Sequence, residues 1–329
     1  MANAYYTCTL LPIEFVARSG YSPRWLGNYL QDPATPARRE ALSVHPMTCP
    51  YVAQLVAAAD VLLGDAPAED CLLVPAGCDA MRRMGDLLAA AYPDRVFVLS
   101  MPRSSGEEVV RTLAVDLARM GGWLTGRLAD GSPAVTGNGA AAGRERPALD
   151  YPMARHPGGV FIVAGPLSDD SLLGLIERLG AQIAGLESCT SPDRWKPLAT
   201  AAFASGADTG DGYRTLAAEL LAIGMCPRRS TADRRKHLAR RLDETRPSSI
   251  IYARQSFCDP GAYDALTVAA LAQERGLPYL EIEVGFPFDA GGPLRTRVEA
   301  FLEAQLLDDD LLNDDLLNDP AQDDLPQED

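Results

Sequence analysis

Short apolar segments alternate with amphipathic ones along most of the chain, and this alternation constrains the fold more than any other feature. Segments of strand length are predicted at residues 71–75, 95–100, 159–164, 182–187, 249–253 and 279–284. Segments with helical periodicity separate them, among them 79–91, 104–120, 168–179, 231–244 and 259–275. Apolar strands separated by helices predict mainly parallel sheets that are covered on both faces. We therefore expect an α/β fold with two such units and a cleft between them.

The chain of 329 residues is long enough for two domains. Residues 121–157 are rich in Gly, Ala and Arg and lose the apolar periodicity, which indicates a linker. We expect an N-terminal α/β domain over 1–150 and a C-terminal one over 151–307. Residues 308–329 hold ten acidic residues and no basic ones. This composition predicts a disordered acidic tail, with an acidic docking strip as the alternative.

Charge and hydropathy exclude several classes of protein. The net charge of −15, which falls to −5 without residues 308–329, argues against a nucleic-acid partner. No apolar run reaches the roughly 18 residues that a membrane-spanning helix needs, so no membrane association is expected. The first residues lack a basic segment ahead of an apolar one, so we expect no signal peptide and a cytoplasmic protein.

Seven cysteines are spread along the chain, and an odd number without an export signal does not predict a disulfide framework. Cys78, Cys189 and Cys258 each follow a predicted strand, and helices are predicted directly after Cys78 and Cys258. In α/β sheets ligands bind at this edge, and helix N-termini stabilise thiolates. The alternative is that each thiol is a small buried hydrophobic group, the role expected for Cys71.

Several common motifs are absent, including a G-x-G-x-x-G loop, a Walker lysine and a G-x-S-x-G elbow. Glu281 and Glu283 share one face of a predicted strand, where they form either its polar side or a pair of catalytic carboxylates. The basic run over 228–241 is predicted to be helical, and we expect it to form a solvated or interface face.

Many short motifs, and the order in which they follow one another along the chain, resemble those of the 2-hydroxyacyl-CoA dehydratase and benzoyl-CoA reductase family. They include Pro12-Ile13-Glu14, Cys78-Asp79, Pro102-Arg103, Glu187-Ser188-Cys189, Cys226-Pro227, Phe257-Cys258-Asp259 and Thr296-Arg297. The resemblance covers roughly residues 8–305. It implies two Rossmann-like, doubly wound domains with a [4Fe-4S] cluster in the cleft between them.

The residues that match the family's cluster ligands are Cys49, Cys78 and Cys258. The resemblance implies a lyase (a 2-hydroxyacyl-CoA dehydratase) or an ATP-dependent acyl-CoA reductase. In such enzymes an electron from a separate ATP-hydrolysing iron–sulfur activator forms a ketyl radical on an acyl-CoA thioester. It also implies a homologous second subunit or a homodimer. No catalytic acid or base is assigned.

Three alternatives remain open from the sequence. Cys8, Cys189 and Cys226 also fall on family-like positions, and with the three ligands they resemble the branch in which six cysteines hold a double-cubane [8Fe-9S] cluster. A non-catalytic scaffold or assembly subunit could keep the fold and use the acidic segment for docking. A cofactor-free α/β binding protein is expected if the three ligand cysteines lie far apart.

Overall fold

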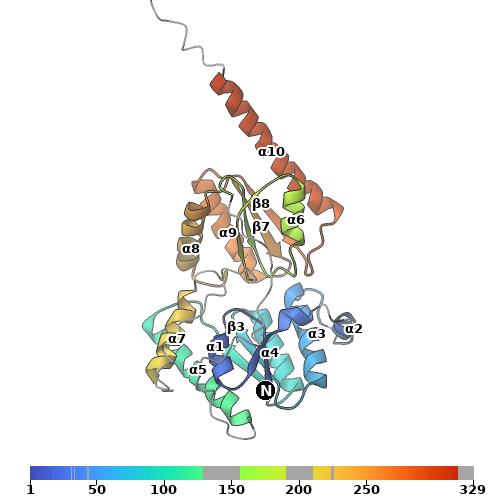
Figure 1. The fold of residues 1–329 in the computed structure, drawn as a ribbon, viewed down its shortest axis with the longest axis vertical. Helices are drawn as coiled ribbons and strands as arrows, with labels where there is room; N and C mark the ends of the chain where they lie inside the picture. The colour runs from blue at the N-terminus through green and yellow to red at the C-terminus, as the bar shows by residue number, and fades with distance from the viewer. Residues whose placement is uncertain are drawn as a thin grey trace, which may run out of the picture.

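Two four-stranded parallel sheets form the framework of the protein (Figure 1). The computed structural model describes residues 1–128, 156–189, 210–223 and 226–317, except positions 31, 33 and 43, with side chains up to residue 305. The first sheet has the order β2-β1-β3-β4, and its strands are β1 (Asn3–Tyr6), β2 (Ser22–Trp25), β3 (Cys71–Ala76) and β4 (Val96–Ser100). The second has the order β6-β5-β7-β8, and its strands are β5 (Val160–Ala164), β6 (Ile183–Ser188), β7 (Ser249–Gln255) and β8 (Tyr279–Val284).

Helices connect the strands and cover the sheets. They are α1 (Ile13–Arg18), the 3-10 helix η1 (Leu26–Tyr29), α2 (Ala34–Ala41), α3 (Pro50–Asp65), α4 (Asp79–Ala91), α5 (Glu107–Arg127), α6 (Ser171–Arg178), α7 (Gly210–Ala222), α8 (Thr231–Thr245), α9 (Asp259–Glu274) and α10 (Gly292–Leu317). Within the described ranges, no helix combines the length and apolar character that crossing a bilayer requires.

The central strands are buried, as parallel strands with helices on both faces should be. Every residue of β3 and of β5 is buried. The second sheet packs a separate apolar cluster against each of its faces, one around Ile162 and the other around Phe161. These two all-parallel sheets flanked by helices confirm the α/β class predicted from the sequence.

Both sheets reverse their strand order beside their first strand. β1 lies between β2 and β3, and β5 lies between β6 and β7. A crevice forms at the carboxyl ends of the strands where the order reverses, because the connections on its two sides run in opposite directions. Cys8 and Cys78 follow the two strands of the first reversal, and Cys258 follows β7 at the second. The topology therefore places cysteines at both crevices.

One helix from the C-terminal half of the sequence packs against the first unit. α7 lies along α5 (Figure 1), and the rings of Phe15 and Tyr213 meet edge to face with centroids 5.7 Å apart. Several α7 side chains, among them Leu216 and Leu220, belong to the same apolar core as β1 and β3. The chain thus returns to the first sheet before it forms α8 and β7.

The fold differs from the sequence prediction before residue 71 and after residue 307, and two other expectations are not tested. The sequence predicts no strand before residue 71, whereas β1 and β2 precede it; β2 contains Pro23, which an edge strand tolerates. The helix expected to end at residue 307 continues through Leu317, and no Gly or Pro interrupts residues 294–317. Most of the expected linker, 129–155, and the acidic residues 318–329 lie outside the described residues.

Candidate functional site

Three helices begin at the cysteines that the sequence resemblance singles out. Cys49 is the N-cap residue of α3, Cys78 that of α4 and Cys258 that of α9. The prediction that Cys78 and Cys258 stand between a strand and a helix is confirmed, since β3 and β7 end just before them. The positive end of a helix dipole stabilises a thiolate at its N-terminus. The helix dipole therefore favours the ligating thiolate form at each of these sulfur atoms, while burial acts against it at Cys78 and Cys258.

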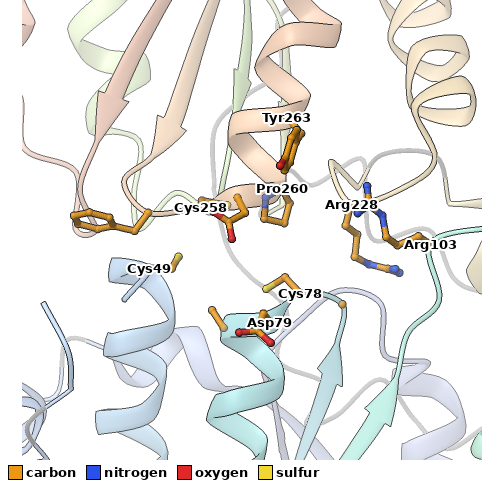
Figure 2. Close-up of a pocket in the computed structure, with 12 residues that line it drawn as sticks. Cys49, Cys78, Asp79, Arg103, Arg228, Cys258, Pro260 and Tyr263 are labelled. Atoms are coloured by element: carbon orange, nitrogen blue, oxygen red, sulfur yellow. The ribbon is translucent and has the colours of Figure 1, made fainter. Parts of the chain in front are cut away.

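The three cysteines line one cavity between the two sheets (Figure 2). Its volume is about 280 Å³, near the lower end of the range for small-ligand pockets. α3 and α4 approach it from the first unit and α9 from the second, as Figure 2 shows. The lining residues are Cys49, Gly77, Cys78, Asp79, Ala80, Arg103, Arg228, Phe257, Cys258, Asp259, Pro260 and Tyr263.

The three thiols interact with one another. A hydrogen bond from Cys258 lowers the pKa of Cys49, while that same bond, together with burial, raises the pKa of Cys258. Burial raises the pKa of Cys78 to about 11, although the backbone N–H of Met81 in the first turn of α4 acts in the opposite direction. Charge on Cys49 raises the pKa of both other thiols, because like charges in a buried site repel. The structure thus brings all three cysteines to one cavity, which the sequence alone could not establish.

The backbone around Cys258 is adapted to this position. Phe257 has a φ of 54°, a left-handed conformation that is uncommon for a large side chain. Gly261, in the first turn of α9, lies so close that an added Cβ would be 3.3 Å from the Cys258 sulfur. The backbone N–H of Gly261 also lowers the pKa of Cys258. Strained residues of this kind concentrate at functional sites, which supports a role for this sulfur.

Three further cysteines lie near the same site. Cys8 and Cys226 both act electrostatically on Cys78 and raise its pKa. Tyr51 lies in the first turn of α3. Burial is the largest cause that raises its pKa, and the charges of Cys8, Cys189 and Cys49 raise it further.

Cys71 differs from the other six cysteines. It is the first residue of β3 and is fully buried, and burial raises its pKa to about 12. It lies at the opposite end of the strand from Cys78. This agrees with the purely apolar role expected for it.

Three thiols line the cavity, and thiolate is the usual ligand of an iron–sulfur cluster. Within the described ranges, no three His, Cys, Asp or Glu side chains are close enough to hold one metal ion. A cubane cluster needs thiolates spread over its corners. Buried oxygen atoms of Thr7, Thr9 and Gln255, which adjoin β1 and end β7, have no hydrogen-bond partner in the described chain.

A buried cluster of charged side chains, which the sequence did not reveal, lies between β6, α8 and α9. Arg234 in α8 donates to Glu187 in β6 at 2.8 Å and to both oxygens of Asp264 in α9 at 2.9 Å. His237 lies 3.1 Å from both oxygens of Glu187. Burial raises the pKa of Glu187, but His237 and Arg234 outweigh this effect and lower it to about 2. The cluster fixes α8 and α9 to β6.

The basic run over 228–241 was predicted to face solvent or an interface, and this prediction is wrong for much of it. Four of its arginines are at most 5% exposed, namely Arg228, Arg229, Arg234 and Arg241. The prediction failed because the acidic partners of Arg234 lie far from it in the sequence. Glu281 and Glu283 pair with Arg254 at 2.8 and 2.7 Å on the polar side of β8, away from the cavity lining.

Comparison with known proteins supports the family that the sequence motifs suggested. Residues 160–304 match the family model described as 2-hydroxyglutaryl-CoA dehydratase, D-component. A protein of Escherichia coli (strain K12) named "Putative dehydratase subunit YjiM" is 32% identical over 136 residues. That match covers 41% of this chain and 33% of the relative, so the chain spans about a third of the length of the curated relative it matches. The matched family segment includes β5 to β8 and Cys258.

Proposed function

We propose, on the premise that this chain is related to the 2-hydroxyacyl-CoA dehydratase family, that it is the iron–sulfur subunit of a dehydratase or reductase of acyl-CoA thioesters. Cys49, Cys78 and Cys258 would hold one [4Fe-4S] cluster. The observation that carries this proposal is the convergence of these N-cap cysteines, from both sheet units, on one cavity. Three thiolates leave one corner of such a cluster open to another ligand.

The bound cluster would supply electron transfer and Lewis acidity at the thioester. Such help is needed because the β-proton of a 2-hydroxyacyl thioester is barely acidic and no side-chain base at neutral pH can remove it efficiently. The protein would hold the thiolates at three helix N-termini and enclose the reaction between its two units. The positive side chains of Arg103 and Arg228 also line the cavity. A separate ATP-dependent activator and a second subunit, as the family implies, would complete the enzyme.

Anaerobic purification followed by iron and sulfide analysis tests the proposal. We expect about four irons per chain and a broad charge-transfer absorbance. Cys78→Ser and Cys258→Ser should lose that absorbance, because each removes a ligand. Cys71→Ser is the matched control, since Cys71 is also a buried cysteine of the β3 segment but lies at the far end of the strand. If the wild-type chain held no iron, the proposal would be refuted and the scaffold alternative would remain.

A second candidate is a double-cubane [8Fe-9S] cluster held by six cysteines. The specific observation in its favour is that Cys8, Cys189 and Cys226 interact electrostatically with groups at the same site. This candidate predicts about eight irons per chain. It also predicts that Cys226→Ser lowers the iron content, whereas the single-cluster proposal predicts that this variant keeps about four.

A further inference from the structure

Arg228 is a buried arginine whose charge has no acidic partner among the described residues. It is 5% exposed, and it lies in the loop before α8. Its Nη1 atom donates to the carbonyl oxygens of Met101 at 3.2 Å and Pro102 at 2.6 Å. Its Nε and Nη2 atoms are buried without a hydrogen-bond partner in the described chain. Half of this guanidinium is therefore left unsatisfied.

The neighbouring buried arginines differ in that their charges are paired with carboxylates, although the Nε atom of Arg229 also has no hydrogen-bond partner in the described chain. Arg229 is 3% exposed and pairs with Asp233 at 3.3 Å, and Arg234 pairs with Glu187 and Asp264. A charge that is removed from water is costly unless an opposite charge or hydrogen bonds compensate for it. Arg228 thus departs from the pattern of the residues beside it. A compensating negative group can reach it from the cavity that it lines.

The position of Arg228 places its side chain against the residue that precedes a candidate cluster ligand, on the wall of the same cavity. Its side chain crosses the backbone of Gly77, where an added Cβ would lie 2.4 Å from Cδ and 2.5 Å from Nε. Gly77 immediately precedes Cys78, and both line the cavity. Only a residue without a side chain permits this close approach. The guanidinium therefore lies beside the segment that presents the Cys78 sulfur.

We infer that Arg228 is a positioning residue that balances the negative charge of the thiolate-bound cluster. The inference rests on the proposed function, because it requires an anionic iron–sulfur group at Cys78. Net charge and hydrogen bonds near the sulfurs set the reduction potential of such a cluster. A positive charge beside Cys78 stabilises the reduced, more negative state. Arg228 should therefore raise the reduction potential and help to retain iron.

Arg228→Met and Arg228→Lys test this role, with Arg229→Met as the matched control. Arg229 is equally buried and contacts the same loop through the carbonyl of Ser104, but its charge is already paired with Asp233 and it does not line the cavity. Redox titration of the iron-loaded proteins should show a more negative midpoint potential for Arg228→Met. Arg228→Lys should remain closer to the wild type, and Arg229→Met should be unshifted.

Thermal unfolding of the chelator-stripped proteins supplies the second readout. Without the cluster, Arg228→Met should be at least as stable as the wild type, because removal of a buried charge that no acidic side chain of the described residues pairs should outweigh the lost bonds to Met101 and Pro102. If Arg228 only fastened the loop at Met101 and Pro102, this variant would destabilise the stripped protein and leave the potential unchanged, and the inference would be overturned. A wild-type chain that holds no iron would instead refute the proposed function. If all variants bind iron and their midpoint potentials equal that of the wild type, the inference about Arg228 is refuted while the proposed function stands.

Discussion

At the scale of single residues, Gly77 permits the Arg228 side chain to lie against the backbone that precedes Cys78. An added methyl group at this position would overlap the side chain of Arg228, which cannot move without breaking its bonds to Met101 and Pro102. We predict that Gly77→Ala lowers the iron content although every cysteine remains. Overpacking of this kind should also lower the free energy of unfolding by about 1–3 kcal/mol.

Gly122 provides the control for this substitution. It lies in α5, and an added Cβ would meet nothing within 4 Å. Gly122→Ala should therefore keep the iron and raise the free energy of unfolding slightly, since Ala favours a helix more than Gly does. Iron analysis and urea unfolding of both variants check the pair. Equal iron content in Gly77→Ala and Gly122→Ala would contradict the steric argument.

At the scale of elements, the Glu187 cluster joins α8 and α9 to the second sheet, and it makes stability depend on pH. The folded protein holds the pKa of Glu187 at about 2, below its ordinary value near 4.5. The stabilisation is thus complete above the ordinary pKa and is lost as the pH falls towards 2. A shift of this size corresponds to about 3 kcal/mol. We predict that the difference in unfolding free energy between the wild type and Glu187→Gln shrinks as the pH falls from 5 to about 2.

A surface carboxylate gives the comparison for this measurement. Glu274 pairs with Arg235, but both side chains are about half exposed, at 52% and 41%. Glu274→Gln should cost less than about 1 kcal/mol at any pH, because solvent screens an exposed pair. Urea unfolding across this pH range separates the two cases. A constant difference for Glu187→Gln would show that its charge does not stabilise the fold.

The elements also show what the sequence could predict. The ranges expected for α4 and β8 match the observed ones, because continuous apolar periodicity marks their length. β1 and β2 were missed because each has four residues, too few to show a period. The burial of Arg234 depends on acidic partners far away in the chain. Convergence of Cys49 with Cys258 is likewise a long-range property, so only the family resemblance could suggest it.

At the scale of the whole molecule, several contacts of the described residues join the two units near the cavity, among them the bonds from Arg228 to Met101 and Pro102. Tyr51 of α3 packs edge to face against Phe286, which follows β8, with ring centroids 5.0 Å apart. The backbone N–H of Ser230 donates to the carbonyl of Arg103 at 3.2 Å. A cluster bound by thiolates from both units would add a covalent link between them. Its binding energy would then stabilise both units together, because a group that binds only the native state raises stability.

We therefore predict that removal of iron by a chelator lowers the melting temperature of the wild-type protein by at least several degrees. The loss should be much smaller for Cys258→Ser, since that variant cannot link the units through the cluster. Cys71→Ser should respond like the wild type. Scanning calorimetry before and after chelation gives the result, and a chelator effect of the same size in Cys258→Ser would refute the coupling.

The N-cap positions of α3, α4 and α9 carry one more consequence. Serine, threonine, asparagine and aspartate are the residues that best begin a helix, and cysteine is not among them. Three helices of this protein therefore start with a residue that suits metal chemistry better than helix formation. Selection for stability alone would have replaced these sulfur atoms with oxygen. If the proposed cluster binds here, the protein without it lies below the stability that its own architecture could reach, which is the compromise expected of a chain shaped around such a cofactor.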